Sequence, residues 1–93
     1  MSQEINNIII NYLKSYNPDR IAVFGSYARK EDGPNSDIDI LVSFSKRVSL
    51  FDLGGMKYDL TELLNRPVDL VTEKALNNRL LPYIKKDLKI IYE

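Results

Sequence analysis

The sequence predicts an α/β (α+β) domain in which a small mixed β-sheet has flanking helices. Two observations predict this class. Four short runs rich in β-branched and aromatic residues are bounded by turn residues, which is typical of strands. Three longer segments repeat apolar residues every three or four positions, which is typical of amphipathic helices. Along the 93 residues the order is helix, strand, strand, helix, strand, helix, strand. We therefore expect a single domain over residues 1–93.

The first half of the chain predicts one long helix and two strands. Apolar residues at helical spacing follow Ser2, which can cap the helix, and Asn17-Pro18-Asp19 then forms a turn. A β-branched and aromatic run ends at Gly25 and predicts the first strand. The expected elements are a helix over 3–15, a strand over 20–24, a helical turn over 26–30, a polar loop over 31–36 and a strand over 37–44.

The second half predicts two more helices and two more strands. Gly54-Gly55 should break or loosen the longer helix, in which Leu63 is expected to face inward, and Pro67 should end it. Pro82 lies near the start of the last helix, where proline is tolerated. The expected elements are a helix over 50–66, a strand over 68–72, a helix over 77–86 and a strand over 89–92.

The composition limits the chemistry. Thirteen basic residues balance thirteen acidic ones, so we expect no direct binding to nucleic acid. The absence of Cys excludes disulfides and thiolate zinc sites, and the absence of His removes the commonest general base. A metal must then be held by oxygen ligands, which favours Mg²⁺ or Mn²⁺. With no basic leader and no apolar run near ~18 residues, we expect a cytoplasmic protein without a membrane span.

Asp37 and Asp39 form the first candidate site. Residues two apart on a strand point to the same face, so these carboxylates should stand side by side and repel each other. A divalent cation would compensate the repulsion. Upstream, Gly25 lies where a strand meets a short helix and would let a phosphate approach the backbone, while the Ser26 hydroxyl can donate to it.

Asp69 adds a third carboxylate, in an otherwise apolar predicted strand. If that strand lies beside the one with Asp37 and Asp39, the three carboxylates converge, and the third binds a second metal or acts as a general base. Plainer interpretations remain open. The pair is a solvated strand end or a metal site, and Arg29 either contacts phosphate or forms a salt bridge with a nearby acid. Tyr27 is expected to pack.

Two segments carry a resemblance to a known family. Gly25–Arg29, followed by Ser36–Val42, resembles the signature of the polymerase-β-type nucleotidyltransferase superfamily. The length, the run Pro67–Val71 and the ending Leu76–Glu93 resemble its smallest members, the minimal nucleotidyltransferases. The resemblance covers nearly the whole chain and implies the nucleotidyltransferase fold. Lys30 stands where the family often has Gly, and we expect this position to shape the loop without inactivating the site.

The resemblance implies transfer of a nucleoside monophosphate from a triphosphate to a hydroxyl, with two Mg²⁺ ions and ATP as substrate. Some members of the group are antitoxins that adenylylate a tyrosine of a partner HEPN ribonuclease toxin, so a hetero-oligomer is expected. By this resemblance the nucleotide-binding residues are Gly25, Ser26 and Arg29, and the catalytic and metal-binding residues are Asp37, Asp39 and Asp69.

Three hypotheses follow. The chain is a protein adenylyltransferase that modifies a toxin, a binding module that neutralises the toxin by contact, or a transferase acting on a small molecule or an RNA 3′ end. A chain of 93 residues leaves little room for an acceptor-binding domain, which disfavours the third.

Overall fold

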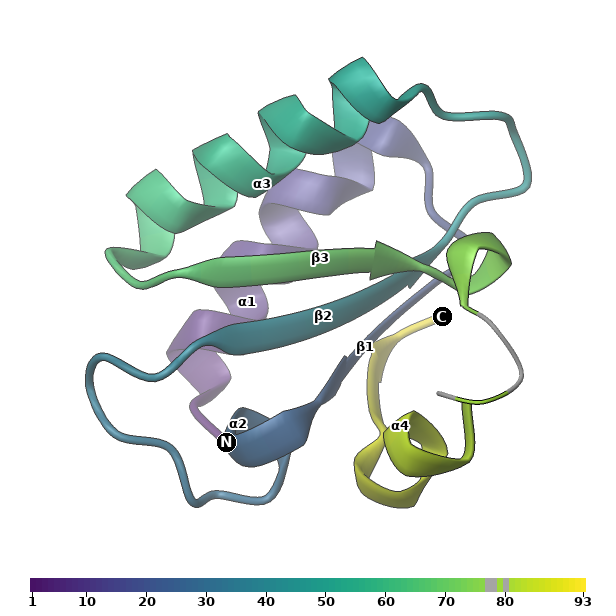
Figure 1. Cartoon of the computed structure of the whole chain (residues 1–93). Helices are drawn as coiled ribbons and strands as arrows, with labels where there is room; N and C mark the ends of the chain where they lie inside the picture. Colours follow the sequence, from purple (N-terminus) through teal and green to yellow (C-terminus); the bar gives the residue numbers. More distant parts are fainter. Residues whose placement is uncertain (77–78, 80) are drawn as a thin grey trace.

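The computed structural model describes residues 1–76, 79 and 81–93 and confirms the mixed sheet with flanking helices. Four strands form one sheet in the order β3-β2-β1-β4. β1 is antiparallel to β2 and β4, whereas β2 and β3 are parallel (Figure 1). The elements are α1 (Gln3–Leu13), a 3₁₀ turn (Lys14–Tyr16), β1 (Arg20–Phe24), α2 (Gly25–Ala28), β2 (Ile38–Ser43), α3 (Leu50–Leu64), β3 (Val68–Thr72), a second 3₁₀ turn (Glu73–Ala75), α4 (Leu81–Asp87) and β4 (Lys89–Tyr92).

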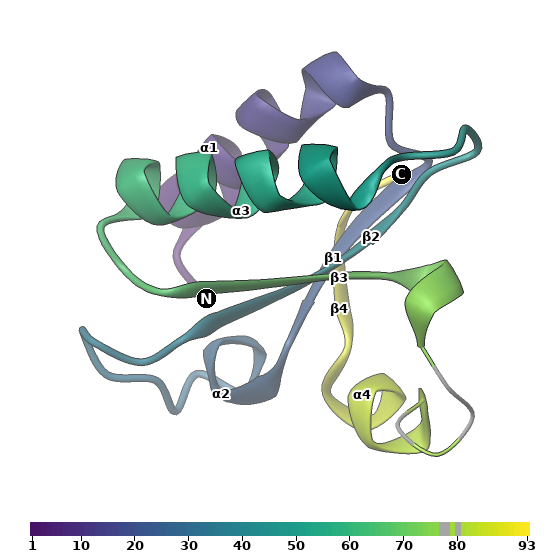
Figure 2. The ribbon, with the colours of Figure 1, turned by 45° about the horizontal axis from the view of Figure 1, so that its top comes forward.

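The hydrophobic core lies between one face of the sheet and the two long helices. α1 and α3 cover that face, whereas α2 and α4 lie on the other side (Figure 2). Alternate residues of β2, namely Ile38, Ile40 and Val42, are fully buried in this core. The residues between them must point to the opposite face, because side chains alternate along a strand. The sheet therefore leaves one face for a core and one for a site.

The helices differ from the sequence expectations at three places. The prediction of a break at Gly54-Gly55 was wrong, because α3 runs through both glycines without interruption. Leu63, expected to face inward, is 54% exposed. The helix ends before Pro67, because Asn65 adopts a left-handed conformation (φ 53°) that cannot continue an α-helix.

Other boundaries shift by a few residues. The first helix stops at Leu13 and continues as a 3₁₀ turn. Asp37 lies just outside β2, which begins at Ile38. The last helix is described from Leu81 onwards, and the predicted start at 77–80 includes residues 77, 78 and 80, which lie outside the described residues. No helix in the described part of the chain is long and apolar enough to span a membrane.

Candidate active site

Asp39 and Asp69 meet on the sheet face that α1 and α3 leave uncovered. The parallel register of β2 and β3 pairs Asp39 directly with Asp69. Neighbouring strands lie about 4.8 Å apart, so the two carboxylates are adjacent. The expected proximity of these two strands is confirmed. A parallel pairing one residue out of register would separate the carboxylates, so the register itself builds this part of the site.

Asp37 approaches the pair from the loop rather than from the strand. The backbone N–H of Ile38 donates to the carbonyl of Pro67 (2.9 Å), and β2 begins there. The pKa of Asp39 rises from 3.8 to about 6, chiefly because burial penalises the charged form, and further because Asp69 and Asp37 are negative. Asp37 therefore acts on Asp39 electrostatically without sharing its strand.

None of these three carboxylates accepts a hydrogen bond from, or forms an ion pair with, the described residues. Asp39 is half-buried, its pKa is raised, and it accepts no hydrogen bond from the described residues. A cation bound beside such a carboxylate would stabilise its charged form. The all-oxygen donors fit a hard divalent ion such as Mg²⁺. However, no three acidic side chains of the described ranges gather into a complete metal cage. The convergence predicted for all three aspartates is thus found for Asp39 and Asp69 only.

Gly25, which directly follows β1, faces the Asp39 carboxylate on the adjacent strand β2. Its φ of +71° lies in the left-handed region that side chains disfavour. A Cβ placed on Gly25 would collide with Oδ2 of Asp39 and lie 3.2 Å from its Cγ. A side chain at this position would therefore fill the space in front of the carboxylate. The absence of a side chain keeps that space open to a ligand.

Ser26 follows at the first turn of α2 and is half-buried. Its backbone carbonyl accepts from the N–H of Glu31 (2.9 Å), which anchors the turn. Its hydroxyl makes no hydrogen bond with any part of the chain that the structure describes. A free hydroxyl beside Gly25 is a donor available to an anionic ligand.

Arg29 is held by two acids. Its Nη1 lies 2.7 Å from Oδ2 of Asp87 and its Nε lies 3.1 Å from Oε2 of Glu31. The salt-bridge interpretation of Arg29 is therefore confirmed, and the structure does not test contact with a phosphate. Arg29 also lowers the pKa of Asp39 slightly, against the larger effects that raise it. The next residue, Lys30, has a left-handed φ of 64°, which explains why glycine suits this position.

The role of Arg66 could not be read from the sequence. Its Nη2 pairs with Oδ2 of Asp32 (2.8 Å), and both Nε and Nη2 donate to the carbonyl of Ser36 (3.1 and 2.9 Å). The Arg66 side chain is only 11% exposed. These contacts fasten the loop that leads into Asp37 to the start of β3. Arg66 lies directly before Pro67-Val68, a position that carries no motif, so no local signal indicates this contact.

Tyr27 packs, as expected. It is 1% exposed, and its hydroxyl lies 2.6 Å from Oδ1 of Asn6 and 3.2 Å from the backbone nitrogen of Ser2. These bonds tie α2, which carries Gly25 and Ser26, to the first turn of α1. Packing therefore positions the glycine-serine turn.

Together, a mixed sheet with a core on one face and unpaired carboxylates opposite a glycine-serine turn on the other define a nucleotidyltransferase fold. The family model described as "Nucleotidyltransferase domain" matches residues 7–92. The chain belongs to this family of transferase enzymes.

Known proteins with the same architecture are similar along most of the chain. A protein of Methanocaldococcus jannaschii described as a protein adenylyltransferase is 45% identical over 74 residues, which are 80% of each chain. A chain from the crystal structure of a toxin-antitoxin with AMP-PNP superposes with a TM-score of 0.86 at 27% identity, covering 94% of this chain and 72% of that one. A chain from the complex of a tri-AMPylated HEPN toxin of Shewanella oneidensis with its MNT antitoxin gives 0.82 at 26% identity, covering 99% and 72%.

Proposed function

We propose that the chain is a Mg²⁺-dependent protein adenylyltransferase that transfers AMP from ATP to a tyrosine hydroxyl of a HEPN-type toxin and so acts as its antitoxin. The observation that carries the proposal is the register pairing of Asp39 with Asp69 in front of Gly25, where neither carboxylate has a partner among the described residues. The similarity to an adenylyltransferase supports ATP as the substrate. The similarity to a chain of a toxin-antitoxin structure with AMP-PNP supports both an adenine nucleotide and a toxin as the partner. Because the reaction consumes ATP, we place it in the cytoplasm.

Within this proposal each residue has a task. Gly25 leaves room for the triphosphate, and the Ser26 hydroxyl donates to one of its oxygens. Asp37, Asp39 and Asp69 would hold two Mg²⁺ ions, which when bound would neutralise charge on the phosphates. The acceptor oxygen bonds to the α-phosphorus as the bond to pyrophosphate breaks. The hydroxyl proton passes to a nearby carboxylate, for which Asp69 is the candidate.

Arg29 has a more distant task. Its two ion pairs occupy it in the absence of nucleotide. We assign it to the side of the triphosphate pocket, where its charge lies close enough to affect Asp39.

The test uses α-labelled ATP, Mg²⁺ and a purified HEPN-type toxin. Label should appear on the toxin with the wild-type chain and disappear with the double variant D37N/D39N. A Tyr→Phe toxin variant that still accepts label would refute the tyrosine assignment. If the double variant protects cells from the toxin as well as the wild type does, neutralisation occurs by binding and not by transfer. Label on an RNA 3′ end or a small molecule would replace the acceptor in the proposal.

A further inference from the structure

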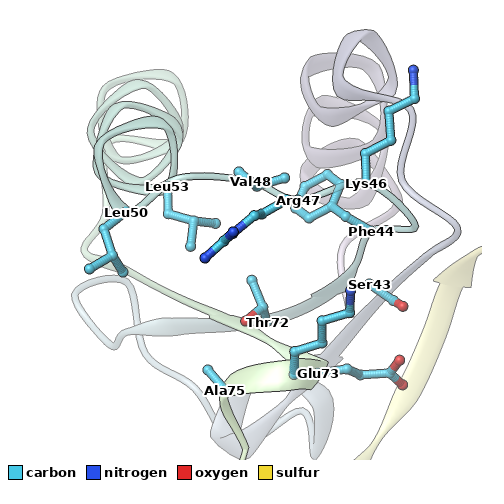
Figure 3. Close-up of a pocket in the computed structure, with 11 residues that line it drawn as sticks. Ser43, Phe44, Lys46, Arg47, Val48, Leu50, Leu53, Thr72, Glu73 and Ala75 are labelled. Carbon is cyan, nitrogen blue, oxygen red and sulfur yellow. The ribbon is translucent and has the colours of Figure 1, made fainter.

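A cavity of about 300 Å³ lies at the end of the sheet remote from the carboxylates (Figure 3). It is bordered by the ends of β2 and β3 and by the start of α3. Its apolar wall includes Phe44 and Leu53, and Arg47 reaches across it (Figure 3). Ser43, which also lines the cavity, lies four positions after Asp39 on β2, a distance of roughly 13 Å along a strand. The cavity is therefore separate from the transfer site.

The rim of the cavity is positively charged. Lys46, Arg47 and Lys74 line it, and none of them makes an ion pair or a hydrogen bond with the described residues. The acid on the same wall, Glu73, is 3.6 Å from Arg20 and is thus partly neutralised. In a chain whose overall charge is zero, three unpaired cations around one apolar cavity favour an anionic partner.

An apolar shoulder continues the cavity onto the surface. Leu50, which lines the cavity, is 87% exposed, and Phe51 beside it is 90% exposed. Their turn of α3 is well formed, because the Ser49 hydroxyl accepts from the N–H of Asp52 (3.0 Å) and the Ser49 carbonyl from that of Leu53 (3.0 Å). The exposure is thus a property of an ordered helix start. Two adjacent large apolar side chains in water indicate an interaction surface.

We propose that this cavity and shoulder form a docking groove for an acidic segment of the acceptor protein, which inserts an apolar side chain beside Phe44 and covers Leu50 and Phe51. The inference rests on the proposed function for the identity of the acceptor. A free nucleotide would fill the cavity and leave the shoulder in water. A peptide covers both and places carboxylates among the three cations, so charge complementarity and shape favour a protein segment.

Docking at a distance from the carboxylates also explains how a small domain could hold a large acceptor protein. The single small sheet and its helices that these 93 residues form must supply both the transfer site and contacts to a large substrate. Contacts at the far end of the sheet would hold the acceptor while its hydroxyl enters the transfer site. Such contacts raise affinity for the acceptor without changing the chemistry at the metal.

The test measures binding of a fluorescently labelled HEPN-type toxin by titration. L50S/F51S should weaken binding at least tenfold, and R47E/K74E should do the same with a smaller dependence on salt. The matched controls are L63S, an exposed apolar residue at the other end of α3, and K57E, an exposed and unpaired lysine of the same helix. Both should bind like the wild type. Because all six positions are exposed, thermal melts should be unchanged.

Catalysis separates this inference from the proposed function. In the transfer assay L50S/F51S should raise the KM for the toxin about tenfold and leave kcat and the KM for ATP unchanged. Unchanged toxin binding by both groove variants would overturn the docking proposal. Displacement of the toxin by free ATP or by a short RNA would also overturn it, if it occurs in the variant D37N/D39N, whose transfer site is disabled. A wild-type chain that binds toxin through the groove but transfers no label would refute the proposed function and leave the groove assignment standing.

Discussion

Replacing Asp39 by Asn should stabilise the metal-free protein although it abolishes transfer. Asp39 has its pKa raised from 3.8 to about 6 because burial and two acidic neighbours disfavour its charged form. A group whose pKa is higher in the folded than in the unfolded state loses stability as the pH rises through that window. The wild-type chain should therefore lose stability between about pH 4 and pH 6 and remain at the lower value above it. The Asn variant has no carboxylate at this position to ionise.

The magnitude follows from the same shift. At about 1.4 kcal/mol for each tenfold change in an equilibrium constant, a rise from 3.8 to about 6 corresponds to roughly 3 kcal/mol at full strength. Asp39 is only half-buried, and solvent screening reduces this to roughly 1–2 kcal/mol. For a domain of this size, 1 kcal/mol moves the melting temperature by about 4–8 °C. We expect D39N to melt roughly 5–10 °C higher than the wild type at pH 7.5.

The assay is thermal unfolding in EDTA at pH 4.0 and pH 7.5, with and without added Mg²⁺. The gain should be much smaller at pH 4.0, where the folded wild-type chain already carries a protonated Asp39. Added Mg²⁺ should raise the melting temperature of the wild type and not that of D39N. The control is E62Q, which removes an exposed carboxylate without a partner from α3. A D39N chain that is less stable than the wild type at pH 7.5, or equally stabilised at both pH values, would refute the reasoning.

Four further substitutions test the surrounding structure. G25A should cost about 1–3 kcal/mol and abolish transfer, measured by urea unfolding and labelling, because its φ is +71° and its Cβ meets Asp39; near-normal activity would contradict the close approach. R66M should lose about 2–3 kcal/mol and raise the KM for ATP, because the Asp32 contact and the loop hydrogen bonds are lost; unchanged kinetics would show that the loop needs no anchor. Y27F should cost about 1–2 kcal/mol in chemical unfolding with kcat unchanged, and a large fall in kcat would give the hydroxyl a chemical role. G54A should raise the unfolding free energy by about 0.5–1 kcal/mol, because a Cβ there meets nothing within 4 Å; a loss would indicate an unseen contact.

Sequence periodicity was sufficient for the sheet and most of the helices. The strand at Arg20–Phe24 and the strand at Val68–Thr72 were predicted to the residue, because β-branched residues between turn signals leave few alternatives. The continuity of α3 through Gly54-Gly55 was not predicted. Burial of Met56 and Leu60 against the sheet outweighs the roughly 1 kcal/mol that each glycine costs a helix.

The site was predicted in part. The neighbouring placement of Asp39 and Asp69 followed from one predicted strand with Asp37 and Asp39 and another with Asp69, once the two strands were assumed to be adjacent. The contacts of Arg66 could not be foreseen, because they join residues about 30 positions apart, and local patterns carry no information about such pairs. The exposed carboxylate of Asp37 was placed on the strand, yet β2 begins one residue later.

The pairing of Asp39 with Asp69 also limits how the gene can change in length. Because side chains alternate along a strand, deleting or inserting one codon inside β2 ahead of Asp39 would turn that carboxylate into the apolar core and bring a leucine or isoleucine to the open face. A change of two codons would restore the face but move the carboxylate about 7 Å along the strand, away from Gly25. Length variation should therefore be tolerated in the turn around Gly33–Ser36 or between β2 and α3. An insertion or deletion within the six residues of β2 should abolish transfer activity.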